Sequence, residues 1–532
     1  MQRLKKAVYP LFIIALLLFS ACSPADMGTA APEQITLTVK MDGSGQGTLA
    51  DKVPAENSPE NAAPQGGPPN GSAPAFDGTQ PEGGMPPQGG TPPDGAPGGA
   101  PPDGTQGGNP PGVPGGGPGG APGGMDSASV PLVGVYSVDG TTLSETGKSY
   151  LASETDQSAI YVFNGGKLTL KNATISTSGG SSSSDASSFY GLNAGALAGA
   201  KSSIDISDST VTTSGNGANG VFAGGEDALV NVTNSQIDCT GQYAHAVMAT
   251  LGGTLHINNV DMSTTGASSG AIATDRGSGT ITVTGGLIKT SGSNSPAIYA
   301  TGDITVSNAS LSSSGSEAAV IEGANSITLN SSSLISTKED KWGVMIYQSF
   351  SGDAEGNEGD FSMTGGSLTY TSSKGPLFYV TNSTANILLK DVEVKAVSGV
   401  LVNASAGRWG KEGANGGTAV LTADKQALEG DLSADAISTL DLTLQNNTSL
   451  IGAINSENTA KEVSLTLDAS SIWTVTADSY LTTITNAAGF AGTTVSNIKG
   501  SGHNVYYKTS ANPDLAGKTY SLNGGGYLKP VE

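Results

Sequence analysis

A short pattern of alternating apolar residues recurs nine times along the chain and constrains its fold more than any other feature. Each copy has two apolar residues separated by one residue, a turn-forming residue two places later and a third apolar residue three places after that. The copies are LTLKNATI at Leu168, IDISDSTV at Ile204, VNVTNSQI at Val230, LHINNVDM at Leu255, ITVTGGLI at Ile281, ITVSNASL at Ile304, ITLNSSSL at Ile327, FSMTGGSL at Phe361 and ILLKDVEV at Ile387. Most steps between copies are 23 to 26 residues, with two longer ones. A fixed period of this size is typical of a solenoid.

The alternation within each copy is that of a short β-strand with one buried face, not that of a helix. The turn-forming position holds Asn, Asp or Gly in eight of the nine copies, and these residues tolerate a left-handed backbone. The nine residues are Asn172, Asp208, Asn234, Asn259, Gly285, Asn308, Ser331, Gly365 and Asp391. We therefore expect the strand to turn a corner at each of them.

Two further strands are expected in each repeat. One begins at the apolar residue after the corner, and another opens the next repeat with Ala or Gly first, as in AIYA at Ala297. Three short strands and three corners per repeat predict an all-β fold, the parallel β-helix. In this register Ile257 should be buried between Val232 and Val283 of the neighbouring coils, about 4.8 Å away. Leucine-rich repeats share the period, but their LxxLxL signature is absent from the chain.

The chain is poor in aromatic residues (5%) and in charged residues (13%), and this composition fits a solenoid. Stacked coils bury Val, Ile and Leu on one another and need few large side chains. The formal net charge is -22 and the pI is about 4.4. This charge argues against nucleic acid and anionic membrane surfaces as partners, since both require clustered Lys and Arg.

The first 22 residues carry targeting signals. Residues 1–21 have a basic start, an apolar run and small residues before Cys22, which predicts a signal peptide. Its end, LFSAC, resembles the bacterial lipobox, in which cleavage before the cysteine is coupled to diacylation of its sulfur. The resemblance implies that lipid on Cys22 anchors the protein at the extracellular face of a bacterial membrane, because two acyl chains hold firmly.

The remaining chain divides by composition. Residues 22–52 are polar, and residues 53–129 are a Gly/Pro-rich segment that we expect to be a disordered linker. Residues 130–532 are the predicted β-helix domain. Within that domain, we expect an N-terminal cap over 130–158, regular coils over 159–399, and irregular coils with a C-terminal cap over 400–532.

The coil pattern, together with SLTLDASSIWTVTADSYLTTI at residues 464–484, resembles extracellular bacterial β-helix proteins of the pertactin-like and pectin-lyase-like group. The resemblance covers residues 130–532 and implies a right-handed coil. Proteins of this group include adhesins, polysaccharide-binding proteins, lyases and hydrolases, so the resemblance specifies the fold far better than the function.

Residues suited to catalysis are scattered along the coils. A glycoside hydrolase needs two convergent carboxylates, and the acidic residues occur singly. Arg276 beside Asp275 is a weak candidate for a lyase base. His245 is expected at a surface or turn position and His256 on an outward strand position, neither with a metal-ligand companion. Cys239 alternates with inward Ile237 and should be a buried, inert thiol.

One enlarged coil, residues 341–366, interrupts the repeat. Its acidic stretch is either a calcium loop or a solvated loop, and its ligands would be Asp353, Glu355, Asn357, Glu358 and Asp360. Aromatic residues in and near it could pack against sugar rings, or could fill a wide coil. They are Trp342, Tyr347, Phe350 and Trp409.

These observations favour a lipid-anchored cell-surface adhesin or polysaccharide-binding protein without catalysis. A polysaccharide lyase or glycoside hydrolase on the same fold is the first alternative. A structural component of the cell wall or of a biofilm is the second.

Overall fold

The computed structural model describes residues 131–349 and 354–532, which belong to one compact unit, Ser127–Glu532. The predicted signal peptide, Cys22, the polar segment and the linker lie outside the described residues, as do Phe350 and Asp353. No helix in the described part is long and apolar enough to cross a membrane.

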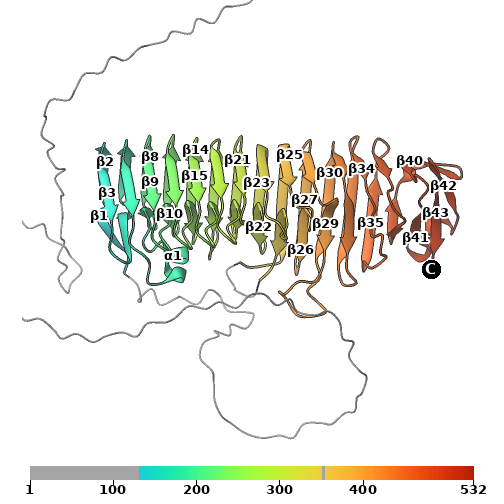
Figure 1. Ribbon diagram of the computed structural model, residues 1–532, viewed down its shortest axis with the longest axis horizontal. Coiled ribbons are helices and arrows are strands. Elements are labelled where there is room, and N and C mark those ends of the chain that lie inside the picture. Colours follow the sequence, from blue (N-terminus) through green and yellow to red (C-terminus); the bar gives the residue numbers. More distant parts are fainter. Residues whose placement is uncertain (1–130, 350–353) are drawn as a thin grey trace, which may run out of the picture. The chain divides into compact units, whose positions relative to one another are not determined.

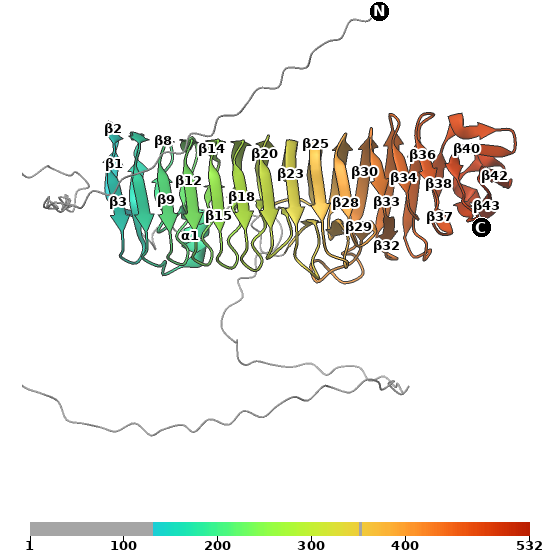
Figure 2. The ribbon, with the colours of Figure 1, turned by 45° about the horizontal axis from the view of Figure 1, so that its top comes forward.

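The unit is a parallel β-helix in which each coil adds one strand to each face of the stack (Figures 1 and 2). A 12-stranded sheet is formed by β1 (Val133–Asp139), β4 (Gln157–Phe163), β7 (Ala196–Ala198), β10 (Val221–Gly224), β13 (Val247–Thr250), β16 (Ile272–Thr274), β19 (Ile298–Ala300), β22 (Ala319–Glu322), β24 (Val344–Tyr347), β26 (Phe378–Thr381), β29 (Val400–Ala404) and β32 (Asp431–Ala434). The predicted β-helix is therefore confirmed.

A 22-stranded sheet holds the other two strands of each coil. The first set is β2 (Thr142–Thr146), β5 (Lys167–Lys171), β8 (Ser203–Ser207), β11 (Leu229–Thr233), β14 (Gly253–Asn258), β17 (Gly279–Thr284), β20 (Asp303–Ser307), β23 (Ser326–Ser336), β25 (Glu358–Tyr370), β27 (Thr384–Lys390), β30 (Thr418–Asp424), β33 (Thr439–Gln445), β35 (Glu462–Leu467) and β38 (Thr483–Thr485). The second set is β3 (Ser149–Ala152), β6 (Thr174–Thr177), β9 (Thr210–Thr213), β12 (Gln236–Cys239), β15 (Asp261–Thr264), β18 (Leu287–Thr290), β21 (Ser310–Ser313) and β28 (Glu393–Ala396). Strands β23 and β25 each continue through the corner, so each of them belongs to both sets.

A 9-stranded sheet continues the stack and closes its C-terminal end. Its strands are β31 (Ala427–Glu429), β34 (Ser449–Ile451), β36 (Ile472–Thr474), β37 (Ser479–Leu481), β39 (Phe490–Ala491), β40 (Thr494–Lys499), β41 (Val505–Lys508), β42 (Tyr520–Asn523) and β43 (Tyr527–Val531). The helices are α1 (Ser184–Tyr190) and the 3₁₀ turns η1 (Ala487–Gly489), η2 (Thr509–Ala511) and η3 (Pro513–Leu515). Antiparallel pairs β39–β40 and β42–β43 lie at this end.

The corners between the two sets of strands have the backbone that the sequence predicts. All nine predicted corner residues have positive φ, from 48° at Ser331 to 70° at Gly285. Neighbouring corners also bond to each other: the Asn259 side-chain amide donates to Asn234 Oδ1 at 3.0 Å. Because the corner takes the same shape in each coil, inward residues of successive strands stay in register.

The core is the stack of inward residues along the coils. Ile257 pairs with Val232 on one side and Val283 on the other, and all three are buried, as predicted. Cys239 is a free, buried cysteine whose Sγ donates to the His245 carbonyl at 3.4 Å. Burial raises the pKa of this thiol to about 12, which keeps it protonated and inert.

Of the two positions predicted for His245, surface or turn, the structure shows the second. It lies at a corner, and its side chain is buried. Nδ1 lies 2.9 Å from the Gly270 carbonyl oxygen, a contact that a neutral ring with hydrogen on Nδ1 satisfies. Burial lowers the pKa of His245 to about 4. His256 faces outward, as predicted.

The segment predicted as the N-terminal cap has the form of one more coil. Its strands β1, β2 and β3 pair in parallel with β4, β5 and β6. The inward positions of this coil continue the core stack, with Val138 opposite Val162 and Leu143 opposite Leu168.

Candidate functional site

The two sheets differ in the side chains that they turn outward. On the 22-stranded sheet the central outward row includes Thr282, Thr305 and Thr328, paired in register. On the 12-stranded sheet one outward row is mostly apolar, and we call it the apolar outer row. Its members, paired in register, are Leu197, Phe222, Met248, Ala273, Tyr299, Val320, Met345 and Tyr379. Except for half-buried Tyr299, all are buried, so other parts of the chain cover this row.

Helix α1 lies against the N-terminal part of the apolar outer row. It begins at the Ser183 cap, whose Oγ accepts from Ala186 N at 3.1 Å, and ends at left-handed Gly191. A Cβ at Gly191 would come within 2.8 Å of Leu197 and Phe222, so only glycine fits this approach. Thr250 Oγ1 on β13 donates to the Phe189 carbonyl at 2.8 Å, which ties the helix to the sheet.

Five aromatic side chains gather over the C-terminal part of the row, around Val320 and Met345. This aromatic cluster consists of Tyr299 on β19, Trp342 before β24, Tyr347 on β24, Tyr379 on β26 and Trp409 in the loop between β29 and β30. The Trp342 and Tyr379 rings are stacked, with centroids 4.2 Å apart and planes 15° apart. The Tyr347 and Trp409 centroids lie 4.7 Å apart. The structure therefore brings together Trp342, Tyr347 and Trp409.

A buried carboxylate, Glu322, lies beneath two of these rings. The Tyr299 and Tyr347 hydroxyls both donate to Glu322 Oε2 at 2.6 Å, and the Ser349 hydroxyl donates to Oε1. Burial, followed by neighbouring groups that include Glu322, raises the pKa of both tyrosines. Both hydroxyls thus stay protonated and act as donors, which fixes the orientation of the two rings.

Two threonines flank this carboxylate along the stack. Thr381 pairs with Tyr347 on the next strand, and Thr301 follows Ala300, which pairs with Ile321. Both hydroxyls are buried and find no hydrogen-bond partner within the described part of the chain. Buried polar groups without a hydrogen-bond partner are uncommon in proteins.

Two cationic side chains, Arg408 and Lys341, lie beside rings of the aromatic cluster. The chain has three arginines. The Arg408 guanidinium lies 4.4 Å from the Trp409 ring centroid, and the Arg276 guanidinium lies 3.9 Å from that of Phe189. Lys341 forms an ion pair of 3.3 Å with buried Glu317 and lies 5.7 Å from the Trp342 centroid.

The predicted calcium ligands are only partly brought together. Glu358 and Asp360 are exposed on β25 and both accept from the Asn386 side-chain amide, at 3.0 and 2.8 Å. Glu355 and Asn357 are also exposed. Among the described residues, no group of three or more His, Cys, Asp or Glu side chains could hold a metal ion. Since Asp353 lies outside these residues, the calcium site stays a prediction.

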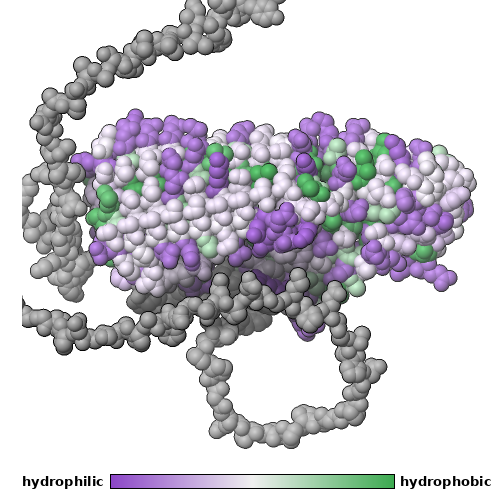
Figure 3. Space-filling view, in the orientation of Figure 1, coloured by the Kyte–Doolittle hydropathy of each residue, from purple (hydrophilic) through white to green (hydrophobic). Residues whose placement is uncertain are grey.

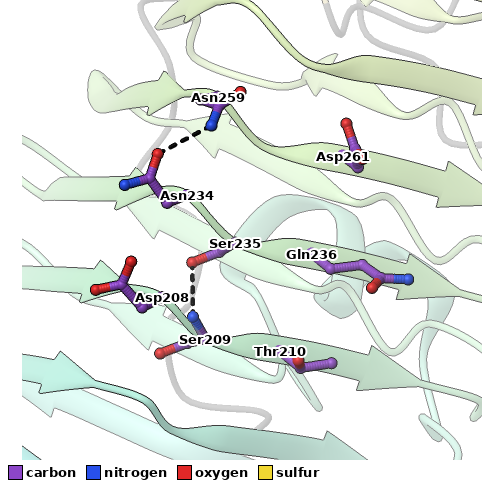
Figure 4. Close-up of a pocket in the computed structure, with 8 residues that line it drawn as sticks. All are labelled: Asp208, Ser209, Thr210, Asn234, Ser235, Gln236, Asn259 and Asp261. Carbon is purple, nitrogen blue, oxygen red and sulfur yellow. Dashed lines mark hydrogen bonds between the residues drawn. The ribbon is translucent and has the colours of Figure 1, made fainter. Parts of the chain in front are cut away.

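A shallow groove of about 490 Å³ runs along the corners of the 22-stranded sheet (Figure 4). Its lining is entirely polar: Asp208, Ser209, Thr210, Asn234, Ser235, Gln236, Asn259 and Asp261. Several of these groups bond within the corners, as when Ser235 Oγ accepts from Ser209 N at 3.0 Å. No aromatic ring lines the groove, so it lacks the flat ring surfaces that the aromatic cluster offers beside Glu322. On the face seen in Figure 3, hydrophobic residues are scattered among neutral and hydrophilic ones.

Sequence reasoning singled out Tyr379 with the other aromatic residues of this region but missed Tyr299 and Glu322. Their signal is present but faint: Glu322 ends the otherwise apolar strand AVIE, and Tyr299 occupies the outward position of an apolar strand. Only the register of the coils shows that these positions share one surface.

No protein-family model, curated protein or solved structure matches this chain.

Proposed function

We propose that this protein binds polysaccharide at the bacterial cell surface without catalysis, held to the membrane by lipid on Cys22. The observation that carries the proposal is the aromatic cluster, in which Trp342, Tyr347 and Trp409 are half-buried and keep part of their surface accessible. Sugar rings pack their apolar faces on such side chains, and nearby polar groups fix their orientation.

The arrangement of the cluster supports a ligand that follows the solenoid axis. Its rings follow the stack in the order Tyr299, Trp342 with Tyr347, Tyr379 and Trp409, and the coil of β22, between the first two, contributes no ring. Neighbouring coils are about 4.8 Å apart, so the cluster extends along the stack over the length of several sugar units. A polymer, rather than a single sugar, makes use of such a length.

The anchor is supported by the lipobox-like LFSAC sequence that ends at Cys22. The resemblance to the pertactin-like and pectin-lyase-like group supports an extracellular site of action. The same resemblance allows adhesins and polysaccharide-binding proteins alike.

Retention of the purified full chain on a panel of insoluble plant and bacterial polysaccharides tests the binding function. We expect Trp342→Ala and Trp409→Ala to lower retention at least tenfold, because each removes a ring face. Tyr527→Ala, which removes an exposed ring at the C-terminal end, is the matched control and should bind like the wild type. Equal retention of all four proteins would reject this site.

A second candidate, a glycoside hydrolase, is favoured by one observation. Asp275 directly follows β16 and Glu322 ends β22, two coil steps further along the stack, and both contribute electrostatically to the raised pKa of Tyr299. Inverting hydrolases hold their two carboxyl groups at about 6.5–9.5 Å. New reducing ends produced by the wild type and abolished by Glu322→Gln, with retention kept, would replace the binding function with this one.

A further inference from the structure

Within the described residues, the first coil differs from the coils after it in having a neighbouring coil on one side only. There β1 pairs only with β4, β2 only with β5, and β3 only with β6. Three strand edges of this coil therefore have no strand partner in the part of the chain that the structure describes. Such edges are templates on which another strand can add.

One inward apolar side chain of this coil is partly uncovered, whereas Val138, Tyr150 and Ala152 are buried. Leu143 occupies the core position opposite Leu168, yet it is 38% exposed, whereas Leu168 is 1% exposed. A second surface with free strand edges and apolar inward residues would cover Leu143 and gain hydrophobic free energy.

One inward position of this coil carries a charge. Glu145 lies opposite Leu170, at the position where the following coils have Ile206, Val232 and Ile257. The Tyr136 hydroxyl donates to Glu145 Oε1 at 3.4 Å, and the Tyr136 and Tyr150 rings lie 4.9 Å apart. Two tyrosines and a carboxylate thus close the end of the core.

The opposite end of the stack is closed differently. There the antiparallel pairs β39–β40 and β42–β43 end the ladder, with Phe490 packed on Tyr520 at 4.9 Å. A second copy that adds to the free edges must therefore present its own first coil. Such a contact is two-fold symmetric and uses the same surface of both copies.

We propose that Glu145 prevents two copies of this chain from joining through their first coils. In that contact both Glu145 carboxylates would be buried in one apolar interface. Like charges in an apolar interface repel each other and lose their hydration. Inward-pointing charges are one of the means by which natural sheets protect their edges.

Sedimentation of the full chain in detergent, over a range of concentrations, tests this role with Glu145→Leu. The variant should form a dimer, with an association constant at least tenfold above that of the wild type. Ser144→Leu adds the same side chain at the exposed outward neighbour and should stay monomeric. Adding Leu143→Lys to Glu145→Leu should return the monomer, since a charge then re-enters the same core surface.

Three results would overturn the proposal. The first is a monomeric Glu145→Leu variant with an unchanged β-sheet circular dichroism spectrum. The second is equal association of Glu145→Leu and Ser144→Leu, which would indicate nonspecific hydrophobic association caused by the added leucine. The third is assembly into long filaments, which would require the C-terminal end to take part.

Discussion

The outer faces of the 12-stranded and 22-stranded sheets are built by the same coils, yet they have opposite character. On the 22-stranded sheet the outward side chains meet water, and a row such as Thr282, Thr305 and Thr328 only has to be soluble. On the 12-stranded sheet the outward row is buried beneath α1 and the aromatic cluster. A solenoid strand can thus serve two cores, one inside the coil and one outside it, and the second core is where function can be placed.

The largest effect is expected inside the coil, which both faces share. Ile257→Asp would bury a carboxylate between Val232 and Val283 and should destabilise the protein by on the order of 5 kcal/mol or more. Chemical denaturation followed by circular dichroism measures the change. A variant as stable as the wild type would show that this register is wrong.

The second prediction compares the loss of stability caused by a substitution on each of the two outer faces. Phe222→Ala removes a fully buried ring from the apolar outer row and should cost about 3–5 kcal/mol. Thr282→Ala, at an outward position of the other sheet, should change the free energy of unfolding by less than about 0.5 kcal/mol. Similar values for the two variants would mean that the 12-stranded sheet has no second core.

The third prediction concerns pH at the corner that leads into β13. His245 has its pKa lowered by burial to about 4, below the ordinary value of 6.5, so the unfolded chain takes up the proton first. Its contribution to stability is complete above pH 6.5 and is lost as the pH falls from 6.5 to 4, by about 3 kcal/mol in all. Unfolding free energies measured across this range should fall less steeply for His245→Gln, and parallel curves would contradict the assignment.

The smallest effect is expected at the hydroxyl of Tyr347, which orients its half-buried ring. Tyr347→Phe keeps the ring but leaves Glu322 with one donor fewer, which should cost about 1–2 kcal/mol. Tyr506→Phe removes a longer hydrogen bond, 3.4 Å to partly exposed Asp478, and should be close to neutral. Glycan retention should fall more for Tyr347→Phe than for Tyr506→Phe. If both variants unfold and bind alike, the Glu322 network does not position the cluster.

The coil could be predicted from the sequence because every repeat needs a left-handed corner and apolar residues at the inward strand positions. Nine corner positions could be named from Asn, Asp, Gly and Ser alone, since the left-handed backbone restricts the residue type. The buried register of Ile257 followed from the period. For His245 a surface or a turn position stayed open, because its burial depends on the Gly270 loop of the next coil, which no local pattern records.

The candidate site could be predicted only in outline. Trp342, Tyr347 and Trp409 drew attention because aromatic residues are rare in this chain. Glu322 did not, because a single glutamate in an apolar strand carries no spacing signal. Its partners Tyr299 and Tyr347 are 23 and 25 residues away in sequence, so only the stacking of coils brings their hydroxyls to one oxygen atom.

The corners of the coil differ in their tolerance of added length. Between the two sets of the 22-stranded sheet the link is short, such as Asn172 and Ala173 between β5 and β6. The segments that lengthen the coil are inserted on either side of the 12-stranded sheet instead: α1 before β7, and residues 405–417 after β29. Length can therefore change there without shifting the register of the stack. A lineage of such chains could exchange these loops freely and acquire new ligands while the coil itself stayed the same.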